Sequence, residues 1–264
     1  MMTGKEKRIT TVDIRKRKGN SPIVCLTAYT TPFASILDKH VDILLVGDSL
    51  GMVLYGMEST LAVTVEMMCQ HGKAVARGSN RSCIVVDMPF SSYQKSKEQA
   101  FENAARIMAE TGCSAIKLEG GKTMKETIRF LTERGIPVMA HVGLTPQSVN
   151  VLGGYSTRGK IKVEYDKILA DAQAVESAGA FSVVIEGVTE KLAIEVTKNL
   201  NIPTIGIGAS EKCDGQVLVT EDMAGMFGKN VPKFVKLYGN MAEQLEKSTI
   251  QFAKEVRQRK FPSN

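Results

Sequence analysis

Short runs of apolar residues recur along the chain, and several of them lead directly into an acidic residue. Residues 43–46 (Ile, Leu, Leu, Val) run through Gly47 into Asp48 and Ser49. Consecutive Ile, Leu and Val residues between polar turn formers are typical of strands covered on both faces, as in a parallel sheet. Three further runs have this form and end in Asp87, Glu119 and Glu186. The pattern predicts buried strands that each deliver a carboxylate at the C-terminal end.

Start and stop signals predict helices between these strands. Ser96 with Gln99, and Thr123 with Glu126, have the spacing of a capping box, which satisfies free backbone N–H groups at a helix start. Three glycines, each followed within a few residues by an apolar run, suit the left-handed residue that ends a helix: Gly112, Gly135 and Gly179. Repeated units of helix, glycine and strand predict right-handed crossovers and a parallel sheet.

Counting strands by these signals gives starts near Ile23, Ile43, Cys83, Ser114, Pro137, Ser182, Pro203 and Gly215. Eight parallel strands in about 250 residues are what a (β/α)8 TIM barrel requires, although an open doubly wound α/β sheet satisfies the same pattern. We predict a single (β/α)8 barrel domain over residues 1–264, with extra helices at residues 9–18 and from Val231 onward. The connection over residues 49–64 lacks helical periodicity and is predicted to be a functional loop.

The net charge of +6 is concentrated at the N-terminus. Residues 1–20 contain seven Lys and Arg residues against Glu6 and Asp13, a net charge of +5, so the remaining residues carry only +1. This basic arm contains no aromatic residue. We interpret it as a solvated or subunit-contacting helix rather than a nucleic-acid site.

The cysteines and the apolar runs bear on the cellular compartment. The five cysteines are scattered and form no C-x-x-C pair, so neither a disulfide framework nor a zinc site is predicted. No apolar run approaches the roughly 18 to 20 residues that span a bilayer, and the N-terminus lacks a signal-peptide pattern. We expect a cytoplasmic protein without membrane contact.

Three strand-end carboxylates are candidates for a metal site. Asp48, Asp87 and Glu119 follow the second, third and fourth predicted strands, which are neighbours in a barrel. Converging carboxylates repel one another unless a cation lies among them, and all-oxygen ligation favours magnesium or manganese. The alternative is that each acid caps the helix that follows it.

Lys117 and His141 are further candidates at the strand ends. Lys117 lies two residues before Glu119, so both side chains face the barrel interior, while Ile116 and Leu118 face the helices. A buried lysine needs a negative partner, which is either a substrate carboxylate or enolate, or Glu119 itself. His141 follows a predicted strand and is either an acid–base group or a structural hydrogen-bonding residue.

Two glycine-rich segments nearly match nucleotide-binding signatures. Residues 154–160 fit G-x-x-x-x-G-K, but Ile161 replaces the required Ser or Thr and no apolar strand precedes the segment. Residues 206–211 follow a predicted strand but lack the third glycine of a dinucleotide fingerprint. The sequence therefore predicts glycine-rich loops without a nucleotide.

Six segments are together more specific than any single motif: residues 46–51 (VGDSLG), 87–90 (DMPF), 115–120 (AIKLEG), 140–147 (AHVGLTPQ), 153–155 (GGY) and 205–209 (IGIGA). They resemble the ketopantoate hydroxymethyltransferase family, and the resemblance covers nearly the whole chain. It implies a barrel of the phosphoenolpyruvate/pyruvate type. Residues 156–158 depart from the usual family pattern, which leaves the detail of that loop open.

The resemblance also implies the roles of individual residues. The metal ligands of the family match Asp48, Asp87 and Glu119. Its substrate contacts match Asp48, Ser49, Asp87 and Lys117. Its proposed base matches Glu186, and His141 is a second catalytic candidate. The resemblance further implies Mg²⁺, with Mn²⁺ also compatible, 5,10-methylenetetrahydrofolate as co-substrate, and a homodecamer.

The implied reaction transfers a hydroxymethyl group from 5,10-methylenetetrahydrofolate to 3-methyl-2-oxobutanoate. The product is 2-dehydropantoate (ketopantoate), in the first committed step of pantothenate and coenzyme A biosynthesis. A divalent ion bound by the keto and carboxylate oxygens of the substrate would acidify the C3 proton and stabilise the enolate.

Two rival functions remain open from the sequence. A phosphoenolpyruvate-mutase or isocitrate-lyase type lyase resembles this fold and metal site, but carries a Lys-Lys-Cys-Gly-His loop that this sequence lacks. A non-catalytic nucleic-acid binder would work through the basic arm, and its binding would depend strongly on salt.

Overall fold

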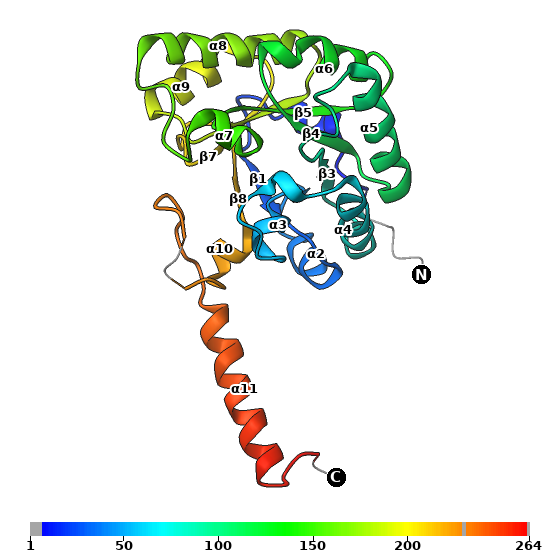
Figure 1. Ribbon diagram of the computed structural model, residues 1–264, viewed down its shortest axis with the longest axis vertical. Coiled ribbons are helices and arrows are strands. Elements are labelled where there is room, and N and C mark those ends of the chain that lie inside the picture. Colours follow the sequence, from blue (N-terminus) through cyan, green and yellow to red (C-terminus); the bar gives the residue numbers. More distant parts are fainter. Residues whose placement is uncertain (1–6, 229–230, 263–264) are drawn as a thin grey trace. The chain divides into compact units, whose positions relative to one another are not determined.

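Eight parallel strands close into a barrel in which each strand pairs with the next along the chain (Figure 1). The computed structural model describes residues 7–228 and 231–262. The strands are β1 (Ile23–Thr27), β2 (Ile43–Val46), β3 (Cys83–Asp87), β4 (Ala115–Glu119), β5 (Val138–Gly143), β6 (Ser182–Glu186), β7 (Thr204–Ile207) and β8 (Gly215–Leu218). Each predicted strand start lies within one residue of the observed start. The barrel prediction is confirmed, and the open sheet is excluded.

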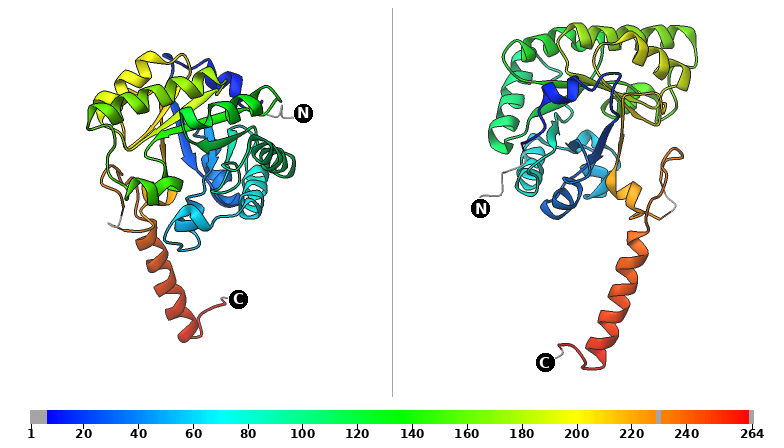
Figure 2. Two further views of the ribbon diagram at one scale, coloured as in Figure 1. Left: turned by 45° about the horizontal axis from the view of Figure 1, so that its top comes forward. Right: turned by 180° about the vertical axis from the view of Figure 1, so that it is seen from behind.

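Helices follow the strands and surround the barrel (Figure 2). They are α1 (Thr11–Arg15), α2 (Thr31–Leu37), α3 (Leu50–Val53), α4 (Val65–Gly78), α5 (Lys97–Thr111), α6 (Lys125–Thr132), α7 (Val149–Leu152), α8 (Lys162–Ser177) and α9 (Glu190–Asn199). Three 3₁₀ turns lie in the connections: η1 (Thr60–Ala62), η2 (Lys122–Met124) and η3 (Pro146–Ser148). The chain forms two compact units, Met1–Val217 and Leu218–Asn264, and a single domain over the whole chain stays a prediction.

Strand side chains alternate between the barrel interior and the surrounding helices. Leu45 of β2 and Val85 of β3 belong to a buried cluster inside the barrel. Ile116 and Leu118 of β4 belong instead to the larger cluster that includes helix residues. Lys117, which lies between them on the strand, therefore points into the barrel, as the sequence predicted.

Two of the predicted helix signals are confirmed by hydrogen bonds and backbone geometry. The Ser96 hydroxyl accepts the backbone N–H of Gln99 at 3.1 Å at the start of α5. Gly112 ends the same helix in the left-handed conformation, with φ of +69°. Both signals act between residues that are close in the sequence, so these helix ends could be predicted without the tertiary structure.

The predicted capping box at Thr123 is wrong, and a residue from another helix accepts an N–H group at this turn. Thr123 lies inside η2, and α6 begins after it without a side-chain cap. The N–H of Lys122 donates instead to Asp171 Oδ1 of α8 at 2.8 Å. A Cβ atom on Gly121 would lie 2.1 Å from the Asp171 side chain, so glycine at this position permits the contact.

Two other predicted segments differ in extent. The predicted helix over residues 9–18 is shorter, because only Thr11–Arg15 is helical. The predicted loop over residues 49–64 contains α3 and η1. All three elements have five or fewer residues, which is too short to produce a readable helical period.

The described part of the basic arm packs on the N-terminal end of the barrel. Ile14 of α1 is fully buried in the interior cluster. Arg17 Nη1 lies 2.8 Å from Asp42 Oδ2, and Lys18 Nζ lies 2.8 Å from Asp214 Oδ2. These contacts differ from a solvated helix, and subunit contact, the other predicted role of the arm, stays a prediction. Residues 1–6 of the arm lie outside the described residues.

Asp38 organises the turn between α4 and β3. Its carboxylate accepts hydrogen bonds from the hydroxyl of Ser79 (2.6 Å) and from the backbone N–H groups of Asn80 (2.8 Å), Arg81 (3.0 Å) and Ser82 (2.8 Å). Burial alone would raise the pKa of Asp38, but these hydrogen bonds outweigh it and lower the pKa to about 2.

We expect Asp38→Asn to lower the free energy of unfolding at pH 7 by about 1–3 kcal/mol, because buried N–H donors lose their acceptor. The folded-state pKa lies below the ordinary value of 3.8, so the ionised form stabilises the fold above that value and its contribution is lost as pH falls toward 2. Urea unfolding should therefore show a stability difference that shrinks between about pH 4 and pH 2. Asp166→Asn, at an exposed position of α8, is the control. Equal midpoints for wild type and Asp38→Asn at pH 7 would contradict this role.

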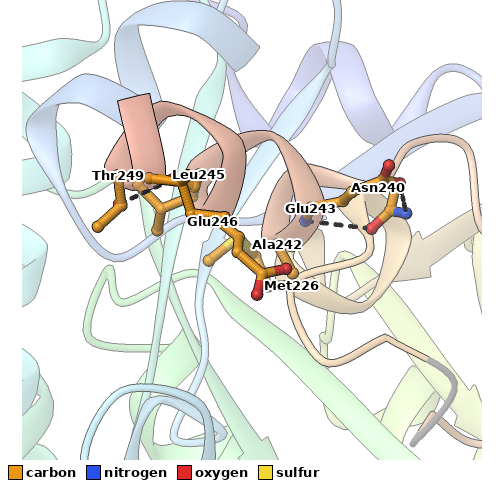
Figure 3. Close-up of a pocket in the computed structure, with 8 residues that line it drawn as sticks. Met226, Asn240, Ala242, Glu243, Leu245, Glu246 and Thr249 are labelled. Atoms are coloured by element: carbon orange, nitrogen blue, oxygen red, sulfur yellow. Dashed lines mark hydrogen bonds between the residues drawn. The ribbon is translucent and has the colours of Figure 1, made fainter. Parts of the chain in front are cut away.

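The second unit contains α10 (Thr220–Ala224) and α11 (Met241–Arg257). Asn240 caps α11, accepting the N–H of Glu243 and donating to its carboxylate at 2.6 Å (Figure 3). These residues belong to a surface pocket lined by Met226, Asn240, Ala242, Glu243, Leu245, Glu246, Thr249 and Ile250. No residue of α11 is buried. The helix predicted from Val231 onward thus begins only at Met241, and its apolar side chains remain accessible.

All five cysteines are buried free thiols. Among the described helices, none has the length and apolar content needed to cross a membrane.

Candidate active site

Inward-facing positions at the C-terminal ends of β3 to β6 bring five predicted site residues to the barrel mouth. Asp87 of β3 is in register with Lys117 of β4, and Glu119 of β4 is in register with His141 of β5. Glu186 is the last residue of the next strand, β6. The C-terminal face is where barrel enzymes carry their chemistry.

Lys117 forms a buried ion pair with Asp87. Its Nζ atom lies 3.0 Å from Asp87 Oδ1, and both side chains are almost inaccessible to solvent. Among the described residues, Lys117 makes no ion pair with Glu119, so the sequence-based alternative is wrong. Adjacent strands lie about 4.8 Å apart, whereas positions two apart on one strand are separated by about 6.6 Å, and this favours the partner on the neighbouring strand.

Asp48 and Ser49 follow β2 and complete this side of the site. The N–H of Asp48 donates to Asp87 Oδ2 at 3.0 Å, and the Ser49 hydroxyl lies 2.8 Å from the Tyr29 hydroxyl. A Cβ atom on Gly47 would lie 2.8 Å from Ser49 Oγ and 3.7 Å from Asp87 Oδ2. Glycine at position 47 therefore allows the turn to bring Asp48 and Ser49 against Asp87.

His141 lies between two carboxylates. Its Nδ1 atom is 3.7 Å from Glu119 Oε1, and its Nε2 atom is 3.3 Å from Glu186 Oε2. Within residues 7–228 and 231–262, neither ring nitrogen makes a hydrogen bond of good geometry. Burial and the nearby Lys117 charge hold the pKa of His141 below its ordinary value, so the imidazole is neutral near pH 7. Because its ring nitrogens make no such hydrogen bond among the described residues, the geometry favours an acid–base role for His141 over a structural one.

Gln147 and Tyr93 belong to the site although the sequence did not single them out. Gln147 of η3 donates through Nε2 to Asp48 Oδ2 at 2.8 Å and through its backbone N–H to Glu119 Oε2 at 3.0 Å. Tyr93 donates its hydroxyl proton to Gln147 Oε1 at 2.6 Å. The available signal for Gln147 was its place at the end of the family segment 140–147, whereas Tyr93 lies outside all six segments.

The three carboxyl groups would give the site an excess of negative charge if all of them were ionised. Burial raises the pKa of Asp48, Asp87 and Glu119 above the usual range, and the charge on Asp48 raises the pKa of the other two further. Burial alone would lower the pKa of Lys117, but Asp87, Asp48 and Glu119 outweigh it and raise that pKa. The Lys117 ammonium is thus a single positive charge among three carboxyl groups.

A magnesium ion fits this donor set when water or substrate oxygens complete its shell. Mg²⁺ prefers oxygen ligands and is commonly held by one or two carboxylates with several waters. In the part of the chain that the structure describes, no three His, Cys, Asp or Glu side chains are grouped closely enough to hold a metal by themselves. The site therefore suits an ion bound by one or two of these carboxylates, and the full three-ligand set stays a prediction.

The helix-capping alternative for these acids is not supported. Ser96, and not Asp87, caps α5. Asp48 and Glu119 likewise do not cap the elements that follow them: within the described residues α3 has no side-chain cap, and Asp171, not Glu119, accepts the first N–H of η2. The carboxylates are therefore available to the barrel mouth.

The glycine-rich segment after His141 lies beside the end of β6. The N–H of Arg158 donates to the carbonyl oxygen of Gly187 at 2.8 Å, and the N–H of Thr189 donates to the carbonyl oxygen of Arg158 at 3.0 Å. Arg158 also forms an ion pair with Glu164. The helix α7, and not a strand, precedes this segment, which agrees with the absence of a P-loop.

The barrel is similar to solved structures of other enzymes. A phosphonopyruvate hydrolase matches with a TM-score of 0.62 at 14% identity, covering 97% of this chain and 89% of that chain. A 2,3-dimethylmalate lyase of the phosphoenolpyruvate mutase/isocitrate lyase superfamily matches with a TM-score of 0.58 at 16% identity, covering 91% of this chain and 98% of that chain. At these identities the likeness shows the fold alone.

Sequence relatives are much closer. A protein of Chelativorans sp. named 3-methyl-2-oxobutanoate hydroxymethyltransferase is 62% identical over 99% of this chain and 92% of its own length. A protein of the same name from Paramagnetospirillum magneticum is 61% identical over 97% of this chain and 93% of its own length. The family model for ketopantoate hydroxymethyltransferase matches residues 8–264. With nearly the whole length matched at this level of identity, the chain belongs to the ketopantoate hydroxymethyltransferase family.

Proposed function

We propose that this enzyme transfers a hydroxymethyl group from 5,10-methylenetetrahydrofolate to 3-methyl-2-oxobutanoate and releases ketopantoate. The observation that carries the proposal is the cluster of Asp48, Asp87, Lys117 and Glu119 beside the His141–Glu186 pair, in a chain of this family. Such a cluster can bind a ketoacid and remove a proton from the carbon next to its carbonyl group. Family membership favours this reaction over the lyase and the nucleic-acid binder.

The residues divide the work between binding and proton transfer. Lys117 has three N–H donors, and its pairing with Asp87 leaves others for the carboxylate of the ketoacid, together with the Ser49 hydroxyl. Glu186, which remains partly exposed beside the neutral His141, takes the C3 proton. Mg²⁺ held by Asp48, Asp87 or Glu119 would supply positive charge that stabilises the enolate oxygen.

The balance of atoms is complete with these reactants and water. C3 loses a proton and forms a carbon–carbon bond with the one-carbon unit. The bonds from that unit to the folate nitrogens break, water supplies the hydroxyl oxygen, and tetrahydrofolate leaves. Lys117 is buried, and the limited access of water there would slow reprotonation of the enolate carbon.

The direct test is an assay of ketopantoate formed from 3-methyl-2-oxobutanoate and 5,10-methylenetetrahydrofolate, with and without magnesium. We expect product only when both substrates are present, and a strong dependence on the metal. Cleavage of the ketoacid or of a 2-methylmalate analogue without folate would instead favour a lyase. Salt-sensitive DNA or RNA binding without turnover would favour the nucleic-acid binder.

We propose that the protein is a homo-oligomer, with the decamer implied by resemblance as the specific assembly. Met241, Leu245, Phe252 and Val256 form an accessible apolar row on α11, and such surfaces commonly mark protein contacts. Light scattering should therefore report a mass several times 28.7 kDa, and Leu245→Glu should reduce it. Gln251→Glu, on another face of α11, is the control. A clean monomer for the wild type would contradict the proposal.

We further propose a cytoplasmic location. The five buried free thiols suit a reducing compartment. Fractionation of cells that carry the chain should place ketopantoate-forming activity with cytoplasmic markers.

A further inference from the structure

Gln147 connects two carboxylates that lie on different parts of the chain. Its side chain is buried, with 6% of its surface exposed. Nε2 donates to Asp48 Oδ2 at 2.8 Å and to the carbonyl oxygen of Met88 at 2.9 Å. Its backbone N–H donates to Glu119 Oε2 at 3.0 Å. One residue therefore holds an oxygen of each carboxylate through two separate donors.

The surrounding groups determine which way the Gln147 amide points. The Tyr93 hydroxyl accepts the backbone N–H of Glu119 at 3.1 Å, and its own proton donates to Gln147 Oε1 at 2.6 Å. A reversed amide would place Oε1 against the Asp48 carboxylate and the Met88 carbonyl, both of which are acceptors. Only the observed orientation satisfies every partner.

This arrangement leaves the other oxygen of each carboxylate free. Among the described residues, neither Asp48 Oδ1 nor Glu119 Oε1 accepts a hydrogen bond. The Gln147 amide is neutral, so it orients the acids without cancelling their charge, as a lysine would, and without adding charge, as a glutamate would. The amide therefore adds no charge that would weaken the attraction of these acids for a cation.

We propose that Gln147 is a positioning residue that aims Asp48 Oδ1 and Glu119 Oε1 toward a divalent cation, with Tyr93 holding its amide in place. The inference rests on the proposed function, because that function supplies the need for the ion. Outer partners that orient ligating carboxylates affect metal affinity by about tenfold or more when they are removed.

The test is calorimetric titration of magnesium chloride into the full-length protein without substrate. Gln147→Met keeps the size of the side chain but removes its donor and acceptor, and should weaken magnesium binding by about tenfold or more. Saturating magnesium should then restore part of the lost turnover. Gln70→Met, the same change at an exposed position of α4, should alter the affinity by less than about twofold, a difference far below that expected from an orienting partner.

Circular dichroism in EDTA shows whether each variant is folded. A folded Gln147→Met protein with wild-type magnesium affinity would overturn the proposal. If Gln147→Met does not fold, Tyr93→Phe is the variant to test, because it removes the hydroxyl that holds the Gln147 amide and should also weaken magnesium binding. An unchanged magnesium affinity of Tyr93→Phe would then overturn the proposal. If the wild-type protein binds no magnesium, the inference about Gln147 is refuted. If no ketopantoate forms in the assay, the proposed function is refuted, but the magnesium affinities of wild type and Gln147→Met can still be compared.

Discussion

Asp87→Asn should lower turnover by at least about 10²-fold, the effect typical of losing a preorganised charged group at a reacting centre. Asp87 is the residue to which the buried Lys117 ammonium and the backbone of Asp48 are both bound. The change removes a candidate metal ligand and also frees Lys117 from its partner. Steady-state ketopantoate formation at saturating magnesium and substrate measures the loss.

The same variant should also be less stable, which changes how the experiment is designed. Removing one partner of a buried ion pair costs about 3–5 kcal/mol, because the other charge stays buried. Asp214→Asn is a matched control: Asp214 is also lysine-paired, through Lys18, but at the opposite end of the barrel. It should lower the unfolding midpoint without lowering turnover.

Glu119→Ala leaves the Lys117–Asp87 pair intact and should also weaken magnesium binding and abolish turnover. If Asp87→Asn and Glu119→Ala both keep the wild-type affinity for magnesium and for substrate, the metal site is refuted.

Glu186→Gln should slow the exchange of the C3 hydrogen of 3-methyl-2-oxobutanoate in deuterated water by about 10²-fold, within the range for one acid–base group. The carboxylate is partly exposed and 3.3 Å from His141 Nε2, so it can meet substrate and pass on a proton. Exchange is measured by NMR with magnesium but without folate, which isolates proton removal from one-carbon transfer. Substrate should still bind, because Lys117 and Ser49 are unchanged.

The control for this experiment is Glu190→Gln, an exposed acid in the first turn of α9 that should exchange at the wild-type rate. Unchanged exchange in Glu186→Gln would move the base to His141, which is neutral and therefore able to accept a proton. A wild type that shows no exchange at all would argue against an enolate and for the lyase reaction.

Much of the fold followed from local patterns. Each strand start could be placed within one residue because buried parallel strands are continuous apolar runs between glycine and polar turn residues. The inward direction of Lys117 followed from the two-residue period of a strand, with Ile116 and Leu118 on the helix side. The capping residue Ser96 was readable for the same reason, since its hydrogen bond joins residues three apart.

Contacts between distant segments were not readable in this way. Thr123 has the residue type and spacing of a cap, yet Asp171, far along the chain, binds the N–H group at that turn. Among protein partners, Glu119 on the same strand was expected for Lys117, which instead pairs with Asp87 on the next strand. In each case the local pattern allowed several partners, and the register of the barrel selected one.

The sequence alone determined the eight strands, the placing of the acids at the C-terminal ends of strands, and the family, because each depends on residue order within one segment or on likeness along the chain. Closure of the strands into a barrel rather than an open sheet was decided by the structure. Only the tertiary structure decided that Gln147 joins Asp48 to Glu119 and that His141 lies between Glu119 and Glu186. These contacts connect residues from separate βα units, and the pairing of strands around the barrel brings those residues together.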